Sequence, residues 1–284
     1  MLSFRPAYRP AVLALTIATV LAGGGPAQTQ GKLEAHYIAT LAGLQIGKGR
    51  WVIEITDDQF TATASGATAG LLRVFASGEG KSASRGAMVA GSPVPGSFTA
   101  SITADKSTEE FRMTLESGEV KEFSVLPPIP SNPERVPLNE AHRHGVNDPM
   151  TASLIRVPGN SNPIGPEACQ RTLAVFDGRM RYDLQLVYKR VDEISADKGY
   201  TGPAVVCAVY FIPLAGHNPQ RSAIKYLINL RDMEIWLAPI AGTRVVVPFR
   251  LSVPTPIGFG IMQATEFVSV PQPARTTAAS TKTQ

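Results

Sequence analysis

The sequence predicts a mostly β protein, built as one large curved antiparallel sheet or an open or closed β-barrel, with one or two short helices. Two observations predict this fold class. Apolar and polar residues alternate with a period of two in segments between residues 33 and 270, as they do in half-buried strands. Turn formers are frequent, with 25 Gly and 23 Pro among 284 residues, whereas one segment alone begins clearly like a helix.

The first half of the chain carries short alternating segments. Asp57-Asp58 and Ser117-Gly118 mark turns between them. Each segment places apolar residues on one face and polar residues on the other, as antiparallel sheets commonly do. The predicted strands cover 33–41, 50–56, 60–65 and, in three pieces, 97–125.

A proline-rich connector follows these strands. Five prolines fall within 127–137, and proline lacks the N–H group that a regular strand ladder requires. We therefore predict a single β domain over 28–270, in which a connector at 127–140 would join halves at 33–126 and 141–270.

The second half is patterned more strongly. Asp148-Pro149 is typical of a helix start, with Asp as the N-cap and Pro at the first helical position, and predicts a helix at 150–155. Asp177-Gly178 predicts the centre of a type I′ hairpin. The predicted strands cover 173–176, 180–189, 205–212, 234–238, 244–253 and 259–270. The polar residues 271–284 predict a disordered tail.

Residues 1–27 are predicted to be a cleaved secretory signal peptide. Arg5 and Arg9 form a basic start, an apolar run covers 11–22, and small residues lead to a cut after Ala27. The alternative is a membrane anchor, which needs about 20 apolar residues; this run has 12. We therefore expect export to an oxidising envelope compartment.

Charge and composition exclude several other classes. The predicted signal peptide carries two of the 27 basic and none of the 23 acidic residues, which leaves the mature chain with 25 against 23, a net charge of +2. No basic run or basic-aromatic stripe is present, so nucleic acid is not an expected partner. No later stretch is long enough to span a membrane, and no cysteine lies at the cleavage site to carry a lipid.

The two cysteines, Cys169 and Cys207, predict a disulfide, because export places them in an oxidising compartment without a third thiol. Two buried free thiols are the alternative. A hairpin centred on Asp177-Gly178 would leave two strand spacings, about 9.6 Å, between the cysteines, more than the roughly 7 Å that a bridge tolerates. Either Cys169 precedes its strand, or the strands do not form a simple meander.

Candidate chemistry is weak. Arg179, Arg181 and Asp183 would share one strand face and could bind an anionic head group, although a solvated outer face with ion pairs explains them as well. His142 and His144 fit a solvated loop better than a metal site. The sequence contains no P-loop, nucleophile elbow, zinc-protease or dinucleotide-binding motif. We expect no catalytic residue, no metal and no cofactor.

Several spaced blocks resemble the family catalogued as domain of unknown function 3108. The blocks are Tyr37, Gly43-Leu44, Gly47, 147–154 (NDPMTASL), Cys169, 175–184 (VFDGRMRYDL), 200–203 (YTGP), Cys207 and 213–217 (PLAGH). The resemblance covers about 33–270. It implies a Gram-negative periplasmic protein without an assigned reaction, and a fold similar to the unclosed barrels of periplasmic lipoprotein carriers.

These observations favour an exported, non-catalytic envelope protein that binds a lipid or lipoprotein in a curved β-sheet. The alternative is a structural or interaction protein that maintains the envelope without a small-molecule ligand; an enzyme ranks last. A large apolar lining inside the sheet would favour the first function, and an interior filled by side chains the second.

Overall fold

The computed structural model describes residues 30–70, 78–105, 107–160 and 162–272. The predicted signal peptide lies outside these residues, as does the predicted tail apart from Pro271 and Gln272. Pro271 still belongs to the last strand, and the backbone N–H of Gln272 donates to the carbonyl of Gln30 at 3.0 Å.

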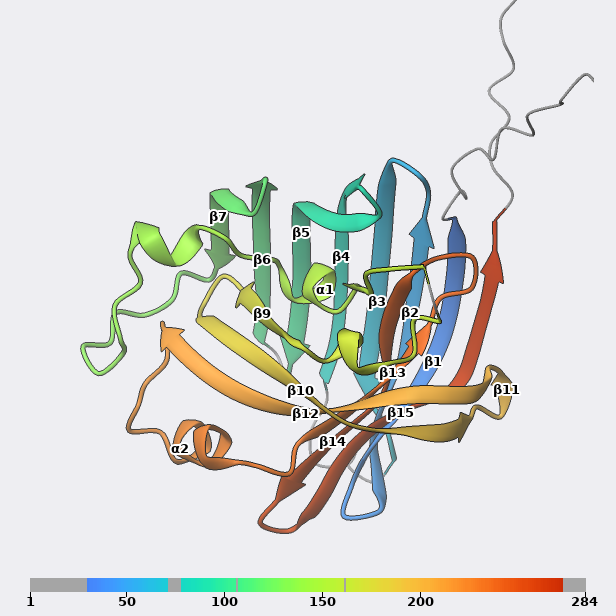
Figure 1. The fold of residues 1–284 in the computed structure, drawn as a ribbon. Coiled ribbons are helices and arrows are strands. Elements are labelled where there is room, and N and C mark those ends of the chain that lie inside the picture. Colours follow the sequence, from blue (N-terminus) through green and yellow to red (C-terminus); the bar gives the residue numbers. More distant parts are fainter. Residues whose placement is uncertain (1–29, 71–77, 106, 161, 273–284) are drawn as a thin grey trace, which may run out of the picture.

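The described residues form one sheet of fifteen strands that does not close, which confirms the predicted mostly β class (Figure 1). The main path runs β7-β6-β5-β4-β3-β2-β1-β15-β14-β13-β12-β10-β9. The strands are β1 (Gly31–Leu41), β2 (Leu44–Ile55), β3 (Gln59–Thr68), β4 (Gly78–Val89), β5 (Ser92–Ala104), β6 (Ser107–Glu116), β7 (Glu119–Leu126), β8 (Ile155–Arg156), β9 (Arg171–Phe176), β10 (Arg181–Ser195), β11 (Lys198–Gly199), β12 (Thr201–Ala215), β13 (Glu234–Pro239), β14 (Val245–Thr255) and β15 (Gly258–Pro271).

The helices within the described ranges are short. They are α1 (Pro149–Ala152) and α2 (Ser222–Asn229), together with the 3-10 turns η2 (Glu140–Arg143) and η3 (Pro166–Ala168). The predicted N-cap is present, because the Asp148 side chain accepts hydrogen bonds from the backbone N–H groups of Met150 and Thr151. Helix α1 ends at Ala152, earlier than predicted, and Ile155 already begins β8.

The chain's two halves share this sheet. Strands β1 to β7 are joined as successive antiparallel hairpins, and β1 pairs on its other side with β15, from Gly31 opposite Pro271 to Leu41 opposite Gly260. The proline-rich connector leaves β7 and reaches the far end of β12, where the Val136 N–H donates to the His217 carbonyl at 2.9 Å.

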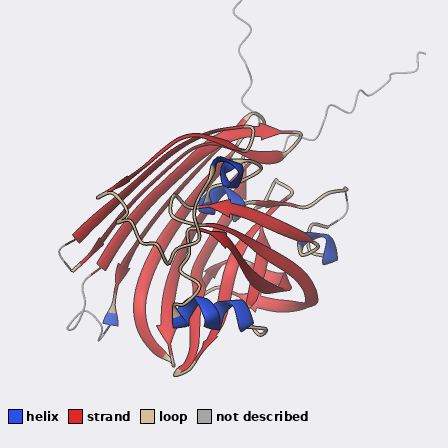
Figure 2. Ribbon diagram, turned by 90° about the vertical axis from the view of Figure 1, so that its left-hand side faces the viewer, coloured by secondary structure: helices blue, strands red, loops and turns tan. Residues whose placement is uncertain are grey.

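The sheet curls so that β9, β10 and β12 cross over one face of the first half, with α1 between the layers (Figures 1 and 2). Its outer strands, β7 and β9, do not pair with each other. The segment after η2 bridges this gap instead. The Val146 N–H donates to the Gly118 carbonyl in the β6–β7 turn, and Asn147 exchanges two hydrogen bonds with Ala174 and Phe176 of β9.

Two large apolar cores fill the space around the layers, and a small third cluster contains Ala204, Val206 and Trp236. The larger core joins β1 to β7 with α1, β13, β14 and β15, and its largest fully buried side chains include Phe60, Phe249 and Phe267. The second core lies on the opposite face of β13 and β14, because Leu237 and Val246 belong to it whereas their chain neighbours Ala238 and Val247 belong to the first.

The predicted type I′ hairpin at Asp177-Gly178 is wrong by one residue. Phe176 pairs with Arg181, so the turn is centred between Gly178 and Arg179. Gly178 has a positive φ of 89°, whereas Asp177 does not, which excludes type I′ geometry. The Asp177 carboxylate accepts the N–H groups of Arg179 and Met180, at 2.8 and 2.7 Å, and this side-chain contact fixes the shifted turn.

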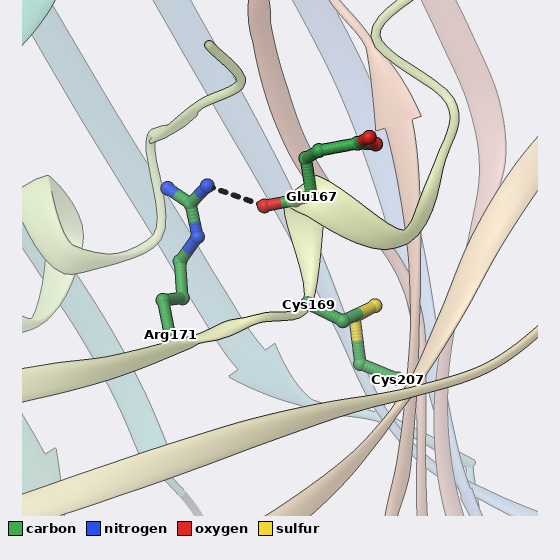
Figure 3. Close-up of a disulfide and its surroundings, with 4 residues drawn as sticks. All are labelled: Glu167, Cys169, Arg171 and Cys207. Atoms are coloured by element: carbon green, nitrogen blue, oxygen red, sulfur yellow. Dashed lines mark hydrogen bonds between the residues drawn. A yellow bond between two sulfur atoms is a disulfide. The ribbon is translucent and has the colours of Figure 1, made fainter.

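The Cys169–Cys207 disulfide is present, with the two Cα atoms 5.5 Å apart. Cys169 caps η3, before β9 begins at Arg171. Cys169 therefore precedes its strand, which was the first of the two explanations that would allow a bridge. Figure 3 shows the bridge crossing from the end of η3 to β12, beside the hydrogen bond from Arg171 to the carbonyl of Glu167. Both cysteines are fully buried in the second core.

Candidate functional site

The candidate site is an apolar groove of about 560 Å³ on the face of β1 to β5 that also carries the larger core. Helix α1 forms one wall through Pro149, Met150 and Ser153, and Met262 of β15 lies at another edge. The volume falls within the range of about 300–1,000 Å³ that is typical of small-molecule sites.

The groove exists because small residues line up across neighbouring strands. Gly49, Gly66 and Gly80 are direct neighbours in the register of β2, β3 and β4. The next row contains Ala64 of β3, followed by Ser82 and Ala100 on the two strands beyond. Side chains this short leave the space above the sheet unfilled, whereas Phe and Leu fill it elsewhere in the core.

Larger apolar side chains border this row of small residues. Tyr37, Trp51, Phe98 and Ile102 all contribute to the lining. The Tyr37 hydroxyl donates a 2.7 Å hydrogen bond to the carbonyl of Pro248, so its polar end is satisfied inside the protein. Burial raises the pKa of Tyr37 well above its ordinary value, and the phenol therefore stays neutral. The groove thus offers contact surface with little polar chemistry.

A buried polar cluster holds the α1 wall against β4. The Asp148 side chain accepts hydrogen bonds from Ser84 Oγ at 3.1 Å and from Thr151 Oγ1 at 2.5 Å, in addition to the two backbone N–H groups. Burial raises the pKa of Asp148, and the hydrogen bonds from Thr151, Ser84 and Met150 oppose that shift. Since every acceptor position is used internally, this carboxyl has a structural role in positioning α1.

The opposite face of the same strands is polar and charged. Arg50 donates two hydrogen bonds to Glu34, and the His36 ring lies between Glu34 and Glu266. The Arg50 contact holds the pKa of Glu34 below its usual value. These exposed ion pairs contribute little to stability, and they leave the groove as the apolar side of the sheet.

The structure separates the residues that the sequence grouped as an anion-binding candidate. Arg179 lies in the β9–β10 turn, where it pairs with Glu109 of β6 at 2.6 Å and covers the Phe111 ring. Arg181 and Asp183 pair with each other at 2.5 Å and are mostly buried. Both arginines are therefore paired with carboxylates within the protein, and binding of a head group at this position stays a prediction.

A second ionic cluster, which was not predicted from the sequence, brings together residues of β10 and β13 that are distant in the chain. Arg190 pairs with both Glu234 and Asp192, and the Trp236 ring lies within 5.6 Å of the Arg190 guanidinium. Hydrogen bonds from Arg190 lower the pKa of Glu234 to about 2. All these charges are satisfied among themselves, so the cluster is a set of cross-strand contacts.

No three His, Cys, Asp or Glu side chains gather as a metal site within the described part of the chain. His142 Nδ1 instead accepts the N–H of Asn139 at 3.1 Å, and His144 lies near Glu119. The described residues also include no helix with the length and apolar character that crossing a membrane requires.

Comparison with known proteins places the chain in a family. The chain has no match among curated proteins. Among solved structures, it is similar to the crystal structure of a beta-barrel-like protein of domain of unknown function DUF1849 from Brucella abortus, with a TM-score of 0.47 and 10% identity over 86% of this chain and 98% of that chain. The family described as protein of unknown function (DUF3108) matches residues 34–265, from the first strand to the last. The chain therefore belongs to the DUF3108 family, as its sequence blocks predicted.

Proposed function

We propose that this chain is an exported, non-catalytic protein of the cell envelope that binds the acyl chain of a lipid or lipoprotein in the groove between α1 and strands β1 to β5. The observation that carries the proposal is the lining of the groove. Its floor consists of Gly, Ala and Ser residues, its borders are mainly aromatic or aliphatic, and its volume is about 560 Å³. Lys48, Arg50 and Lys81 also border it, at positions whose side chains alternate to the other face of the sheet.

An acyl chain suits this lining for a physical reason. A flexible hydrocarbon gains from any apolar contact and needs no directional hydrogen bonds, and each buried methylene contributes about 0.8 kcal/mol. The affinity should therefore rise by about fourfold for each added methylene until the groove is filled. A polar substrate would find few partners here, because the Tyr37 hydroxyl is already bonded within the protein, although the indole N–H of Trp51 is buried in the lining without a partner.

The proposed location follows from the predicted signal peptide and agrees with the disulfide. An exported chain meets an oxidising compartment, where a buried bridge between Cys169 and Cys207 is stable. We place the protein in the periplasm, with lipids, lipoproteins or other envelope proteins as its partners.

A structural or interaction role without a ligand is the second candidate. It is favoured by the larger core, whose side chains fill most of the space between the layers. The two candidates differ in one respect: a purely structural protein has no use for glycine at residue 80, where a Cβ would meet no neighbouring atom closer than 3.7 Å, and it would tolerate a larger side chain there.

The test is displacement of a fluorescent fatty acid, cis-parinaric acid, by saturated fatty acids of 10 to 18 carbons. We expect the affinity to increase with chain length and then level off. In Gly80→Leu, binding should fall by at least about tenfold, because the leucine occupies the groove. The backbone has room for it, since a Cβ at Gly80 would lie 3.7 Å from its nearest neighbouring atom, the Ser101 carbonyl oxygen.

Ala83→Leu is the matched control. Ala83 lies on the opposite face of β4, so the same bulk is added outside the groove. Equal binding by the native protein and Gly80→Leu would contradict the proposal. Loss of binding in Ala83→Leu alone would move the site to the outer face.

A further inference from the structure

Two neighbouring hairpins expose large apolar side chains at one end of the molecule. Leu44 follows the β1–β2 turn, and Ile257 and Phe259 lie at the β14–β15 turn, with 62%, 70% and 54% of their surfaces exposed. Together we call these three residues the apolar tip. Figure 1 shows both hairpins extending beyond the ends of the neighbouring strands at the lower end of the view.

The two hairpins form one unit. The Ala42 N–H donates to the Phe259 carbonyl at 3.0 Å, and a Cβ added to Gly258 would lie 2.9 Å from the Ala42 Cβ. The tip is therefore one continuous feature with a fixed shape, and its side chains project from turns that are tied to the sheet.

The apolar tip is also continuous with the groove. Met262 of β15 lines the groove and is 37% exposed. Opposite it, Ala39 of β1 pairs with Met262 and lines the same groove. Leu41, two residues after Ala39 on the same face of β1, pairs with Leu44, so apolar side chains lead from the groove to this residue of the apolar tip.

The charge around the tip is positive. No Asp or Glu occurs between residues 35 and 53 or between 235 and 265, whereas Lys48 lies on β2, four residues from Leu44. The acidic residues Glu79 and Asp105 are three and four strands from β1, about 14–19 Å away at ordinary strand spacing. Glu234 is nearer, since it pairs in register with Ser252 of β14, but Lys189 and Arg190 already neutralise its carboxylate.

We propose that the apolar tip inserts into the surface of an anionic phospholipid bilayer. Exposed aliphatic and aromatic side chains at the ends of turns can enter the boundary between head groups and acyl chains without burying a strand edge, and nearby cations attract anionic head groups. The tip would give an acyl chain a route between the bilayer and the groove, and to that extent the inference rests on the proposed function.

The test uses single thiols, because both native cysteines are bonded to each other. Ile257→Cys is labelled with the polarity-sensitive dye NBD, and the protein is mixed with vesicles of phosphatidylethanolamine and phosphatidylglycerol in a 3:1 ratio. We expect the emission to rise and shift to the blue. Val89→Cys, labelled in the same way, is the matched control, because Val89 is 57% exposed beside a turn at the opposite end of β4.

A second measurement compares vesicle flotation of the native protein with that of Leu44→Ser/Ile257→Ser. We expect the double variant to partition at least about tenfold less, and Val89→Ser to behave like the native protein. High salt or pure phosphatidylcholine should weaken binding of the native protein. Binding of cis-parinaric acid should be unchanged in the double variant. Membrane insertion by the tip and acyl-chain binding in the groove are therefore tested separately.

Two outcomes would overturn the inference. One is equal flotation of the double variant and the native protein, or no response of the dye at residue 257. The other is a native dimer in analytical ultracentrifugation that the double variant converts to a monomer, since the tip would then contact a second copy of the chain.

Discussion

Removal of the Asp148 carboxyl should destabilise the protein, and the contacts of this carboxyl indicate by how much. Asp148 is fully buried and caps α1, which forms a wall of the groove. Loss of a helix N-cap costs about 0.5–2 kcal/mol, and each hydrogen bond to a charged acceptor about 1.5–3 kcal/mol. Ser84 Oγ and Thr151 Oγ1 lie 3.0 Å apart and can pair with each other after the change. We therefore expect Asp148→Ala to lower the free energy of unfolding by about 3 kcal/mol.

Asp148→Asn is the informative partner variant. Its amide oxygen can still accept the N–H groups of Met150 and Thr151, and its NH₂ group can donate to the two hydroxyl oxygens, which accept as well as donate. We expect this variant to lose about 1 kcal/mol. Urea unfolding gives both free energies, and thermal unfolding should show a shift of roughly 2–4 °C per kcal/mol for a domain of this size.

The pH dependence of the unfolding free energy gives an independent check on the direction in which the pKa of Asp148 is shifted. Burial raises the pKa of Asp148 above its ordinary value of 3.8, so the folded state binds the proton more tightly than the unfolded state does. The resulting stabilisation is fully present below about pH 3.8 and is lost as the pH rises through the folded-state pKa. Asp148→Asn lacks this contribution. The difference in unfolding free energy between the native protein and this variant should therefore shrink as the pH rises from 4 to 7.

Either of two results would refute this reasoning. An equal cost for Asp148→Ala and Asp148→Asn would mean that the hydrogen bonds do not determine the stability of α1. A difference that grows with pH would mean that those hydrogen bonds outweigh burial and hold the pKa of the carboxyl below 3.8.

Three further predictions concern the bridge, the turn and export. Replacement of Cys169 and Cys207 by Ser should lower the free energy of unfolding by about 2–5 kcal/mol, and thiol labelling of the denatured, unreduced native protein should find no free cysteine; two labelled thiols would exclude the bridge. Gly178→Val should lower the melting temperature, because Gly178 has a φ of 89° and an added Cβ would lie 3.3 Å from the Phe111 ring; an unchanged melting temperature would contradict the turn geometry. The intact mass of the protein extracted from envelopes should lack about the first 27 residues, and a full-length mass would contradict cleavage.

Most strands could be predicted from the sequence, because the alternation of apolar and polar residues within each strand reflects which of its side chains are buried. Leu33, Ala35 and Tyr37 alternate with polar residues in the printed sequence, and all three are buried in the structure. Asp148 before Pro149 likewise predicted the start of α1, since an N-cap depends on residues within one turn. These patterns depend only on residues close together in the chain, so they do not change with the order of the strands in the sheet.

Strand β4 was not predicted, because its core-facing residues are small, and these same small residues create the groove. Its core-facing positions include Gly80, Ser82, Ser84 and Gly86, so the strand shows no apolar alternation. Helix α2 was also missed; it is eight residues long and lacks a side-chain N-cap. In both cases the chain lacks the local pattern by which the other elements were identified.

The groove itself could not be predicted from local pattern. Gly49, Gly66 and Gly80 are separated by 14 to 17 residues in the sequence and become neighbours only through the register of three strands. The register of the β9–β10 hairpin shows how sensitive such positions are, because a shift of the turn by one residue changes every pairing along both strands. Since the register depends on turns and bulges, the lining of a concave face emerges only with the fold.

Native mass spectrometry of the protein purified from its own envelope would show directly whether the groove holds an acyl chain. We expect a population whose mass exceeds that of the mature chain by the mass of a lipid or fatty acid, and we expect that population to be lost in Gly80→Leu but not in Ala83→Leu. Native protein that carries no added mass, and that also fails to bind cis-parinaric acid in solution, would contradict the claim and favour a structural role in the envelope.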